Sequence, residues 1–345
     1  MRYLFLVFSS LVLGVYSKFY FFLDFLLYRR FNTGRVLYFT IIIFFLGVLG
    51  SLKSDYFNIS ESLRLPVYIY FSFLLSNFIF ARKNIVFSRV FYLLVFLQFL
   101  NFVLLKTSNF NLSEFSRLIE FSTVDYLDDG EYFDISRLSI GNPSSFSLIL
   151  FISYILKKNF NGLKKVDFVL IFICLLLTGS RSILFILFFY TALSTFKRFK
   201  YFYIGAVVMA CIIYFQNQDF FVSDNRLFKI GGSGDLLRLT FYEEFFKLLP
   251  SSVLIGNSPG YINFIVNDII SREMSAESLY IEIISSYGLV FFIWLIFKAH
   301  KLLADNTFLL TFLLIGFLIP VHNYILFWVL IFLKIKLNVW NNNIK

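Results

Sequence analysis

The chain has 345 residues, of which 59% are hydrophobic and only 15% are charged. Soluble domains carry about 25% charged residues, so no soluble core could hide this much apolar surface. The net charge of +10 does not indicate nucleic-acid binding, because the basic residues stand in short clusters beside apolar blocks. The 51 phenylalanines are scattered over every block without alternating polar partners, which argues against a β-barrel. The composition predicts an all-α polytopic membrane protein.

Apolar blocks predict about eleven or twelve membrane-spanning helices. Residues 3–28 form either one long span or a hairpin broken at Ser17 and Lys18. The single span gives eleven helices in total, and the hairpin gives twelve. The N-terminus has the charge and apolar run of a signal peptide but no small-residue cleavage site, so we expect it to be retained. The later predicted spans are 36–50, 65–80, 90–105, 143–156, 167–180, 182–196, 202–216, 276–297, 307–319 and 322–333.

Clusters of Lys and Arg in every second loop predict the orientation of these spans. Short loops rich in Lys and Arg stay in the cytoplasm, which places the C-terminus there as well. The opposite face receives segments 51–64, 106–142, 179–181, 217–275 and 320–323. We therefore predict one multi-span domain, residues 1–345, with these segments on the external (periplasmic) side of the membrane.

The longest periplasmic segment, residues 217–275, holds most of the polar chemistry. Its sequence "GGSGDLLRLTFYEEFFKLLP" predicts an amphipathic helix with Asp235 as N-cap and Pro250 at its end. Glu243 and Lys247 are spaced i, i+4 and are predicted to form a helix-stabilising pair. We therefore exclude Glu243 from the candidate catalytic residues.

Two arginines on the predicted periplasmic face are candidates for binding an anion. Arg181 lies in "TGSRS", a tight turn between two short spans, and Arg238 lies on the amphipathic helix. A guanidinium group binds phosphate oxygens through a two-pronged fork. The structural alternative for Arg181 is a side chain that reaches the lipid headgroups. Tyr242, one turn after Arg238, and Arg272 are further candidates for substrate binding.

Two residues are candidates for acid–base catalysis. Glu277 lies where the chain re-enters the membrane, and a carboxylate there could accept a proton from a hydroxyl group. The helix dipole is a sufficient structural reason for Glu277, whereas Glu282, deeper in the same helix, is costlier to bury. His322 lies in a periplasmic turn and is a second candidate base. No zinc spacing, nucleotide-binding loop or nucleophile elbow occurs, so no metal or cofactor is predicted.

Three motifs in the second half of the chain resemble the O-antigen polymerase and ligase superfamily, which includes the Wzy polymerases. They are "TGSRS", "LRLTFYEEF" followed by "IGNSPGY", and "AESLYIEIISSYGLVFFIWL". The resemblance implies a glycosyltransferase that uses oligosaccharides linked to undecaprenyl pyrophosphate, with Arg181 and Arg238 on the donor pyrophosphate. It also implies a chain-length-regulating co-polymerase as a partner.

The resemblance favours a polymerase over a ligase. Ligases of this superfamily carry a His-Asn pair where the helix re-enters the membrane after the large loop, whereas this chain has Ala276-Glu277-Ser278 there. Its own His322-Asn323 pair comes one hairpin later. The alternatives are an O-antigen ligase that transfers the glycan to lipid A core, a flippase or proton-coupled transporter, and an acyltransferase acting on surface glycans.

The Glu277 hypothesis predicts the result of an isosteric substitution. Glu277→Gln removes the proton acceptor and should lower polymerisation by about 10²- to 10⁴-fold. Glycan chain length on a gel, measured at matched protein levels, checks this. Full chain length in the variant would exclude Glu277 as the base.

Overall fold

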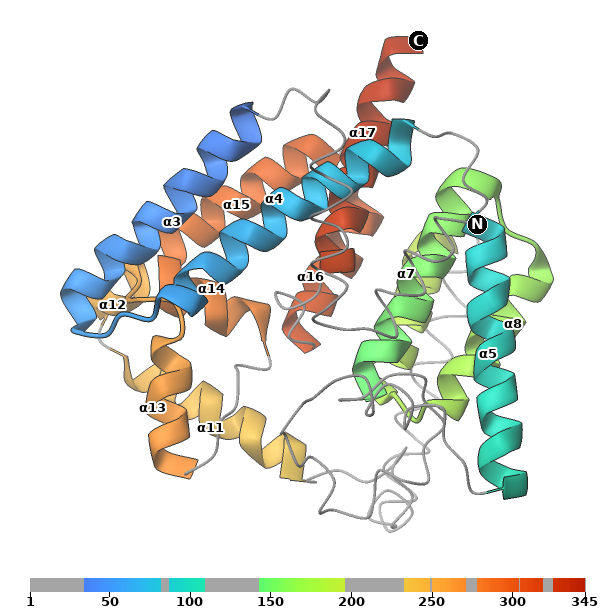
Figure 1. Cartoon of the computed structure of the whole chain (residues 1–345), viewed down its shortest axis with the longest axis horizontal. Coiled ribbons are helices and arrows are strands. Elements are labelled where there is room, and N and C mark those ends of the chain that lie inside the picture. Colours follow the sequence, from blue (N-terminus) through green and yellow to red (C-terminus); the bar gives the residue numbers. More distant parts are fainter. Residues whose placement is uncertain are drawn as a thin grey trace. The chain divides into compact units, whose positions relative to one another are not determined.

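The computed structural model describes residues 34–81, 87–108, 143–195, 233–248, 250–270, 278–303, 305–318 and 325–344. These residues form helices joined by short connections, and no strand occurs among them (Figure 1). The prediction of an all-α chain is therefore confirmed for the described part. The predicted spans at 3–28 and 202–216 lie outside the described residues.

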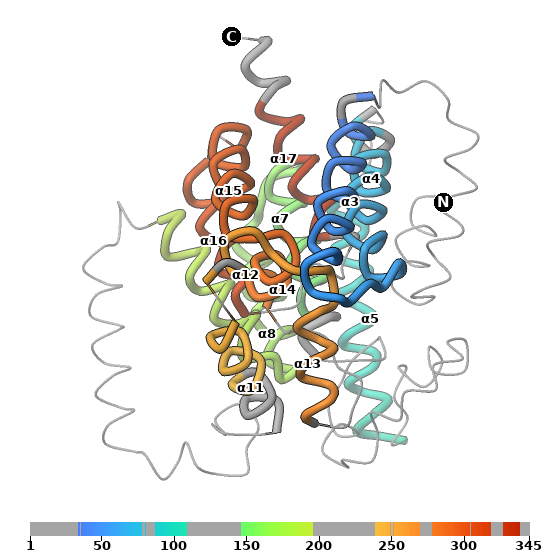
Figure 2. The backbone as a smooth tube through the Cα atoms, turned by 90° about the vertical axis from the view of Figure 1, so that its left-hand side faces the viewer, coloured from blue at the N-terminus to red at the C-terminus, as the bar shows by residue number. Residues whose placement is uncertain are grey.

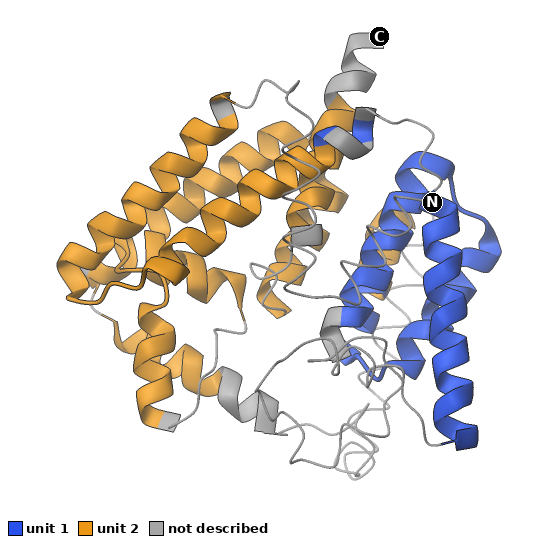
Figure 3. Ribbon diagram, in the orientation of Figure 1, with its two compact units in different colours: residues 1–31, 77–187 blue, residues 32–76, 188–345 orange. Residues whose placement is uncertain are grey.

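The chain divides into two compact units, residues 1–31 with 77–187 and residues 32–76 with 188–345 (Figure 3). In the first unit, three helices contact one another: α5 (Phe87–Ser108), α7 (Pro143–Asn161) and α8 (Lys165–Leu177). A further helix, Arg181–Thr195, begins at the end of this unit.

The second unit is organised around one short helix, α14 (Leu279–Tyr287). The other helices are α3 (Gly34–Ser54), most of α4 (Ile59–Ala81), α11 (Ser233–Lys247), α12 (Pro250–Ile255), α13 (Tyr261–Ile270), α15 (Leu289–Leu303), α16 (Asn306–Leu318) and α17 (Ile325–Ile344). Helix α14 contacts α3, α11, α12, α13, α15 and α16, and it lies in the middle of these helices (Figure 2). A residue on α14 is therefore enclosed on several sides.

Two of the described helices, Val36–Ser54 and Phe87–Ser108, are long and apolar enough to cross a membrane. They coincide with the predicted spans 36–50 and 90–105. Two shorter apolar helices, Arg181–Thr195 and Asn306–Leu318, coincide with predicted spans as well.

Helix α3 exposes its large apolar side chains and packs its small residues inward. The exposed side chains form one stripe along the helix: Tyr38, Ile41, Phe45, Leu49 and Leu52. On the inner side, a Cβ added at Gly47 would come within 2.9 Å of the Pro259 ring, and one at Gly50 would overlap the carbonyl group of Asn257. A helix of a soluble protein has the opposite pattern, with its apolar face inward. Small residues at helix contacts are typical of membrane bundles.

The first unit has the same inverted pattern around a buried ion pair. Lys157 of α7 and Asp167 of α8 form a salt bridge with side chains only 3% and 0% exposed. The Tyr92 hydroxyl group accepts a hydrogen bond from Lys157 at 2.8 Å and donates one to Asp167 at 2.8 Å. By contrast, Val166 and Val169, which lie on α8 next to Asp167, are exposed. Lys157, predicted to belong to a cytoplasmic basic cluster, has its charge balanced inside the helix bundle.

The predicted span 276–297 contains two helices and not one, because the helix breaks at Gly288. Helix α14 ends at Tyr287 and α15 begins at Leu289, with Gly288 at φ +88° and ψ 159°. Only glycine adopts this conformation readily. A Cβ at this position would also overlap the carbonyl of Leu254 on α12. With nine residues, α14 is about 14 Å long, roughly half the thickness of a bilayer core.

Helix α11 confirms the helix predicted in the long periplasmic segment, with three differences. It begins two residues before Asp235, which therefore lies in its first turn and is not the N-cap. Pro250 opens α12, a position that suits a residue without an N–H group. Lys247 pairs with Glu244 at 2.5 Å, so the predicted pair with Glu243 is wrong.

Replacing Gly288 tests whether the helix break is structurally required. Gly288→Ala should destabilise the folded state by at least about 1–3 kcal/mol through backbone strain, and further through its overlap with α12. Gly162→Ala is the matched control, because Gly162 has φ +75° but nothing lies within 4 Å of an added Cβ. Thermal unfolding of the detergent-purified protein checks this. An equal decrease in melting temperature in the two variants would mean that the close contact between Gly288 and α12 does not contribute to stability.

Candidate functional site

The candidate site is centred on Glu282, a carboxylate buried on the central helix. Ser278 caps α14, its side chain accepting a hydrogen bond from the Tyr280 N–H at 3.3 Å. Glu282 lies in the first turn, where the helix dipole favours a negative charge. It is only 8% exposed. Glu282, which the sequence indicates to be costlier to bury than Glu277, is therefore buried in the structure.

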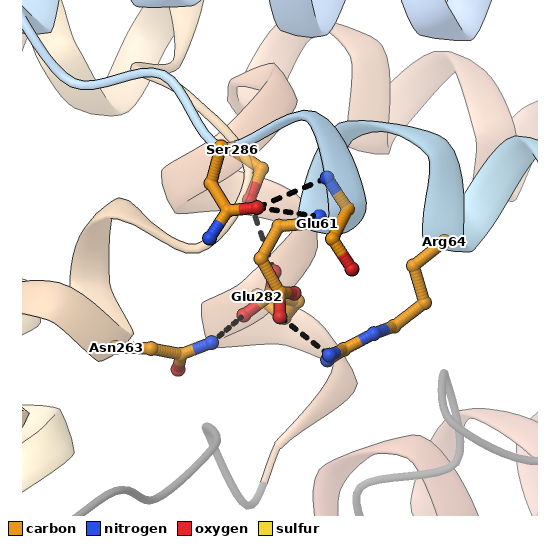
Figure 4. A network of polar contacts seen from close by, with 7 residues as sticks. Glu61, Arg64, Asn263, Glu282 and Ser286 are labelled. Carbon is orange, nitrogen blue, oxygen red and sulfur yellow. Dashed lines mark hydrogen bonds and ion pairs between the residues drawn. The ribbon is translucent and has the colours of Figure 1, made fainter.

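The hydrogen bonds to Glu282 are few and long. The Asn263 side chain of α13 donates to one carboxylate oxygen at 3.5 Å, and the Ser286 hydroxyl donates to the other at 3.3 Å (Figure 4). The Gly260 N–H also donates to this carboxylate. Hydrogen bonds to a charged group are normally about 2.7–2.9 Å long. Glu282 therefore retains the capacity to accept stronger hydrogen bonds.

A second carboxylate, Glu61, lies beside the first with an arginine partner. Asn58 caps α4, its side-chain oxygen accepting from the N–H groups of Ser60 at 3.0 Å and Glu61 at 3.2 Å. One turn later Arg64 forms an ion pair with Glu61, and both residues act electrostatically on Glu282 (Figure 4). Burial raises the pKa of Glu61 above its ordinary value of 4.5, and Arg64 opposes the rise. The site therefore combines two carboxylates with one guanidinium group.

The loop 256–260, "GNSPG", holds these elements together. Its Asn257 N–H donates to the Ser285 carbonyl of α14 at 2.7 Å. The loop backbone reaches Gly50 of α3 so closely that no side chain would fit there, and a Cβ at Gly260 would come within 2.8 Å of Glu61. The loop thus fixes the start of α4 against α14. This loop belongs to one of the motifs that carry the family resemblance. In the structure, it positions the carboxylates.

Helix α11, which carries Arg238 and Tyr242, packs beside this cluster. Phe241 of α11 is fully buried against Ile262 and Val266 of α13 and Ile281 of α14. The Tyr242 ring lies 6.0 Å from the ring of Phe317 and packs against the same apolar cluster. Tyr242 therefore has a packing role, and its role in substrate binding stays a prediction. Arg238 precedes Phe241 by one turn on this anchored helix.

Arg181 belongs to the other unit and lies in the predicted turn. Helix α8 ends at Leu177, Gly179 adopts φ +65°, and the next helix begins at Arg181, whose side chain is exposed. Thr178 shares a 2.7 Å hydrogen bond with Ser147 of α7, which holds the turn to its neighbour. Arg181 and Arg238 lie in different units, so their joint action on one ligand stays a prediction.

Three predicted site residues, Arg272, Glu277 and His322, lie outside the described residues. Among the residues that are described, no group of three or more His, Cys, Asp or Glu side chains is arranged to hold a metal ion.

Sequence reasoning did not identify Glu61, Arg64 or Asn263. The first two lie in the predicted loop 51–64, which the structure resolves into the end of α3, a cap and the start of α4. The signal available in the sequence was Asn58 followed by "ISESLR", a helix-start pattern with an i, i+3 acid–base pair. Nothing in the sequence links Asn263 to Glu282, since that contact exists only when α13 packs on α14.

The raised pKa of Glu61 predicts a pH-dependent stability. Because the folded state holds this proton more tightly than the unfolded chain, the stability that Glu61 contributes is greatest below 4.5 and is lost as the pH rises through the raised pKa. Glu61→Gln should abolish this contribution, which lowers the slope of the free energy of unfolding against pH by up to about 1.4 kcal/mol per pH unit. Melting temperatures between acidic and neutral pH check this, with exposed Glu243→Gln as the control. An unchanged slope in Glu61→Gln would rule out this assignment.

The chain matches no family model, no curated protein and no solved structure. The fold and the candidate site therefore rest on the residues and contacts described above.

Proposed function

We propose that this protein is a multi-pass membrane glycosyltransferase that polymerises lipid-linked oligosaccharide repeat units. The growing chain would pass from undecaprenyl pyrophosphate to the terminal sugar of an incoming lipid-linked repeat unit, at the periplasmic face of the cytoplasmic membrane. The observation that carries this proposal is the cluster of Glu61, Arg64, Asn263 and Glu282.

The cluster joins segments that the charge pattern independently assigns to one side of the membrane. Glu61 and Arg64 come from segment 51–64, and Asn263 comes from segment 217–275; both segments are predicted to be periplasmic from the basic residues of other loops. Glu282 lies in the predicted span 276–297, in the first turn of the helix that follows segment 217–275. Their contact through polar side chains agrees with that orientation and supports a working site at this face.

The inverted surface of the helices supports the membrane location. Bulky apolar side chains are exposed along α3, whereas polar and charged groups such as Asp167 and Glu282 are buried. Ionisable residues in membrane proteins face the interior of the bundle, where partners and water compensate their charge. The broken helix α14–α15 fits the same setting, because backbone irregularity in a membrane is tolerated where protein surrounds it.

In the proposed reaction, Arg238 and Arg181 bind the donor pyrophosphate and stabilise the charge that develops on it. Glu277, or His322 in its place, accepts the proton of an acceptor hydroxyl group. The hydroxyl oxygen forms a bond to the anomeric carbon of the donor sugar as the bond from that carbon to the pyrophosphate oxygen breaks. Undecaprenyl pyrophosphate leaves with the electron pair. Because pyrophosphate is a good leaving group, positioning and charge stabilisation suffice for this step.

A flippase or transporter for the same lipid-linked glycan is the second candidate, and one observation favours it. Transporters bury ionisable residues in their bundles, and the Lys157–Asp167 pair is such a feature. An O-antigen ligase, with the same donor and lipid A core as acceptor, is the third candidate.

The surface glycan of cells that lack this gene distinguishes the three functions. Loss of a polymerase leaves a single repeat unit on the lipid A core, whereas loss of a flippase or ligase leaves the core without even the first unit. We expect the single-unit pattern, restored to a full ladder by the wild-type gene. An unchanged ladder would remove the polymerase proposal.

Complementation with Arg238→Ala tests the donor site. Losing charge-assisted hydrogen bonds to pyrophosphate should reduce polymerisation about ten- to hundred-fold, and Arg238→Lys should restore only part of it. Arg89→Ala is the matched control, because Arg89 is an exposed arginine on the face predicted to be cytoplasmic. A full ladder with Arg238→Ala at normal protein levels would remove Arg238 from the site.

A further inference from the structure

Four buried side-chain atoms near Glu282 lack a hydrogen-bond partner. They are the Ser62 and Ser258 hydroxyl groups, the Asn257 amide nitrogen and the Tyr287 hydroxyl group. Their residues are between 0% and 4% exposed. Buried polar groups almost always have a partner, and leaving one unsatisfied costs about 1–3 kcal/mol. Four such groups in one region indicate that something polar completes it.

These four residues belong to the elements that surround the carboxylates. Tyr287 follows Ser286 on α14 and lies within electrostatic reach of both Glu282 and Glu61. Asn257 and Ser258 come from the loop whose Gly260 donates to Glu282. Ser62 follows Glu61 on α4, and Pro66, which has no N–H group, leaves the Ser62 carbonyl without its helical donor. The unsatisfied groups and the carboxylates thus form one polar region.

The composition of this region selects among classes of ligand. A phosphate or pyrophosphate would be repelled by two carboxylates that have one described arginine, Arg64, between them. A divalent cation needs six or more oxygen ligands, and a tyrosine hydroxyl and an amide N–H are donors that would not coordinate it. A neutral molecule with several hydroxyl groups can donate to the carboxylates and accept from Tyr287 and Asn257. That chemistry is a sugar.

We propose that Glu282, Tyr287 and Asn257 form the binding site for the acceptor sugar, separate from the site of the donor pyrophosphate. In this site a sugar hydroxyl group donates to the Glu282 carboxylate, and the Tyr287 hydroxyl and Asn257 amide donate to sugar oxygens. The inference rests on the proposed function. Glu277, the candidate base, immediately precedes the Ser278 cap of the helix that carries Glu282 and Tyr287, so the candidate base and the proposed sugar site belong to one stretch of the chain.

Acceptor kinetics test this site with the purified full-length protein in lipid nanodiscs. The donor is a repeat unit linked to undecaprenyl pyrophosphate whose acceptor hydroxyl group is blocked by methylation, so that it cannot act as acceptor, and it is held at saturation. The acceptor is the soluble repeat-unit oligosaccharide released from its carrier. Tyr287→Phe removes one hydroxyl group and Glu282→Gln removes one charge. Each should raise KM for the acceptor roughly ten- to hundred-fold while KM for the donor stays at the wild-type value.

Matched controls make the same chemical changes on exposed surface. Tyr38→Phe on α3, where Tyr38 is 68% exposed, and Glu243→Gln on α11 should leave both KM values unchanged. An unchanged acceptor KM in Tyr287→Phe and Glu282→Gln would overturn the proposal, because ordered water would then be the partner of these groups. A parallel fall in kcat and melting temperature without a change in acceptor KM would assign both residues a structural role and overturn it too.

Direct binding separates failure of this site from failure of the proposed function. If the wild-type protein forms no polymer, the polymerase proposal fails, and equilibrium binding of the same oligosaccharide to wild type and to Tyr287→Phe still decides the sugar site. Binding that weakens in Tyr287→Phe supports the site without turnover. Equal binding, or no binding to the wild type, overturns it.

Discussion

The burial of the Glu282 carboxylate is the constraint on which the second unit depends. A carboxylate with 8% of its surface exposed must be compensated by donors, by a nearby cation or by a bound proton. Each neighbouring element supplies part of that compensation: α13 an amide, α14 a hydroxyl and a helix start, the GNSPG loop an N–H group, and α4 an arginine. The elements come from distant parts of the sequence, so the cost of burying one charge is offset only when all of them are packed.

The short length of α14 follows from the same constraint. A continuous helix from residue 279 to 303 would satisfy its own backbone and leave few groups to turn toward a polar region. The break at Gly288 lets the backbone of α12 approach, and it ends the central helix at Tyr287. Small residues have the same effect on α3, where Gly47 and Gly50 leave room for the loop that carries Asn257 to pack closely against the helix. The polar region is therefore built by close backbone contact, which bulkier residues at these glycines would prevent.

Under the proposed function, the second unit offers different charge environments for two kinds of ligand on neighbouring elements. Carboxylates gather where α4 meets α14, which suits neutral hydroxyl groups, while Arg238 lies on α11, anchored to α13 and α14 by Phe241. A transferase that joins a sugar to a sugar on pyrophosphate needs both environments close together but distinct, because an anion and a carboxylate repel each other. The buried Lys157–Asp167 pair of the first unit is outside this division, and its tyrosine partner and helix cap account for it structurally.

The sequence by itself determined the all-α class, the positions of most helices and a single predicted face for the polar segments, because hydropathy and basic clusters are local properties. It also indicated that Glu282 would be costlier to bury than Glu277, and it placed Arg181 at the junction of two short helices. Only the tertiary structure decided the break at Gly288 and the joining of Glu61, Arg64 and Asn263 to Glu282. These contacts link residues separated by long stretches of chain, and they depend on how closely backbones approach at glycines, which no local pattern encodes.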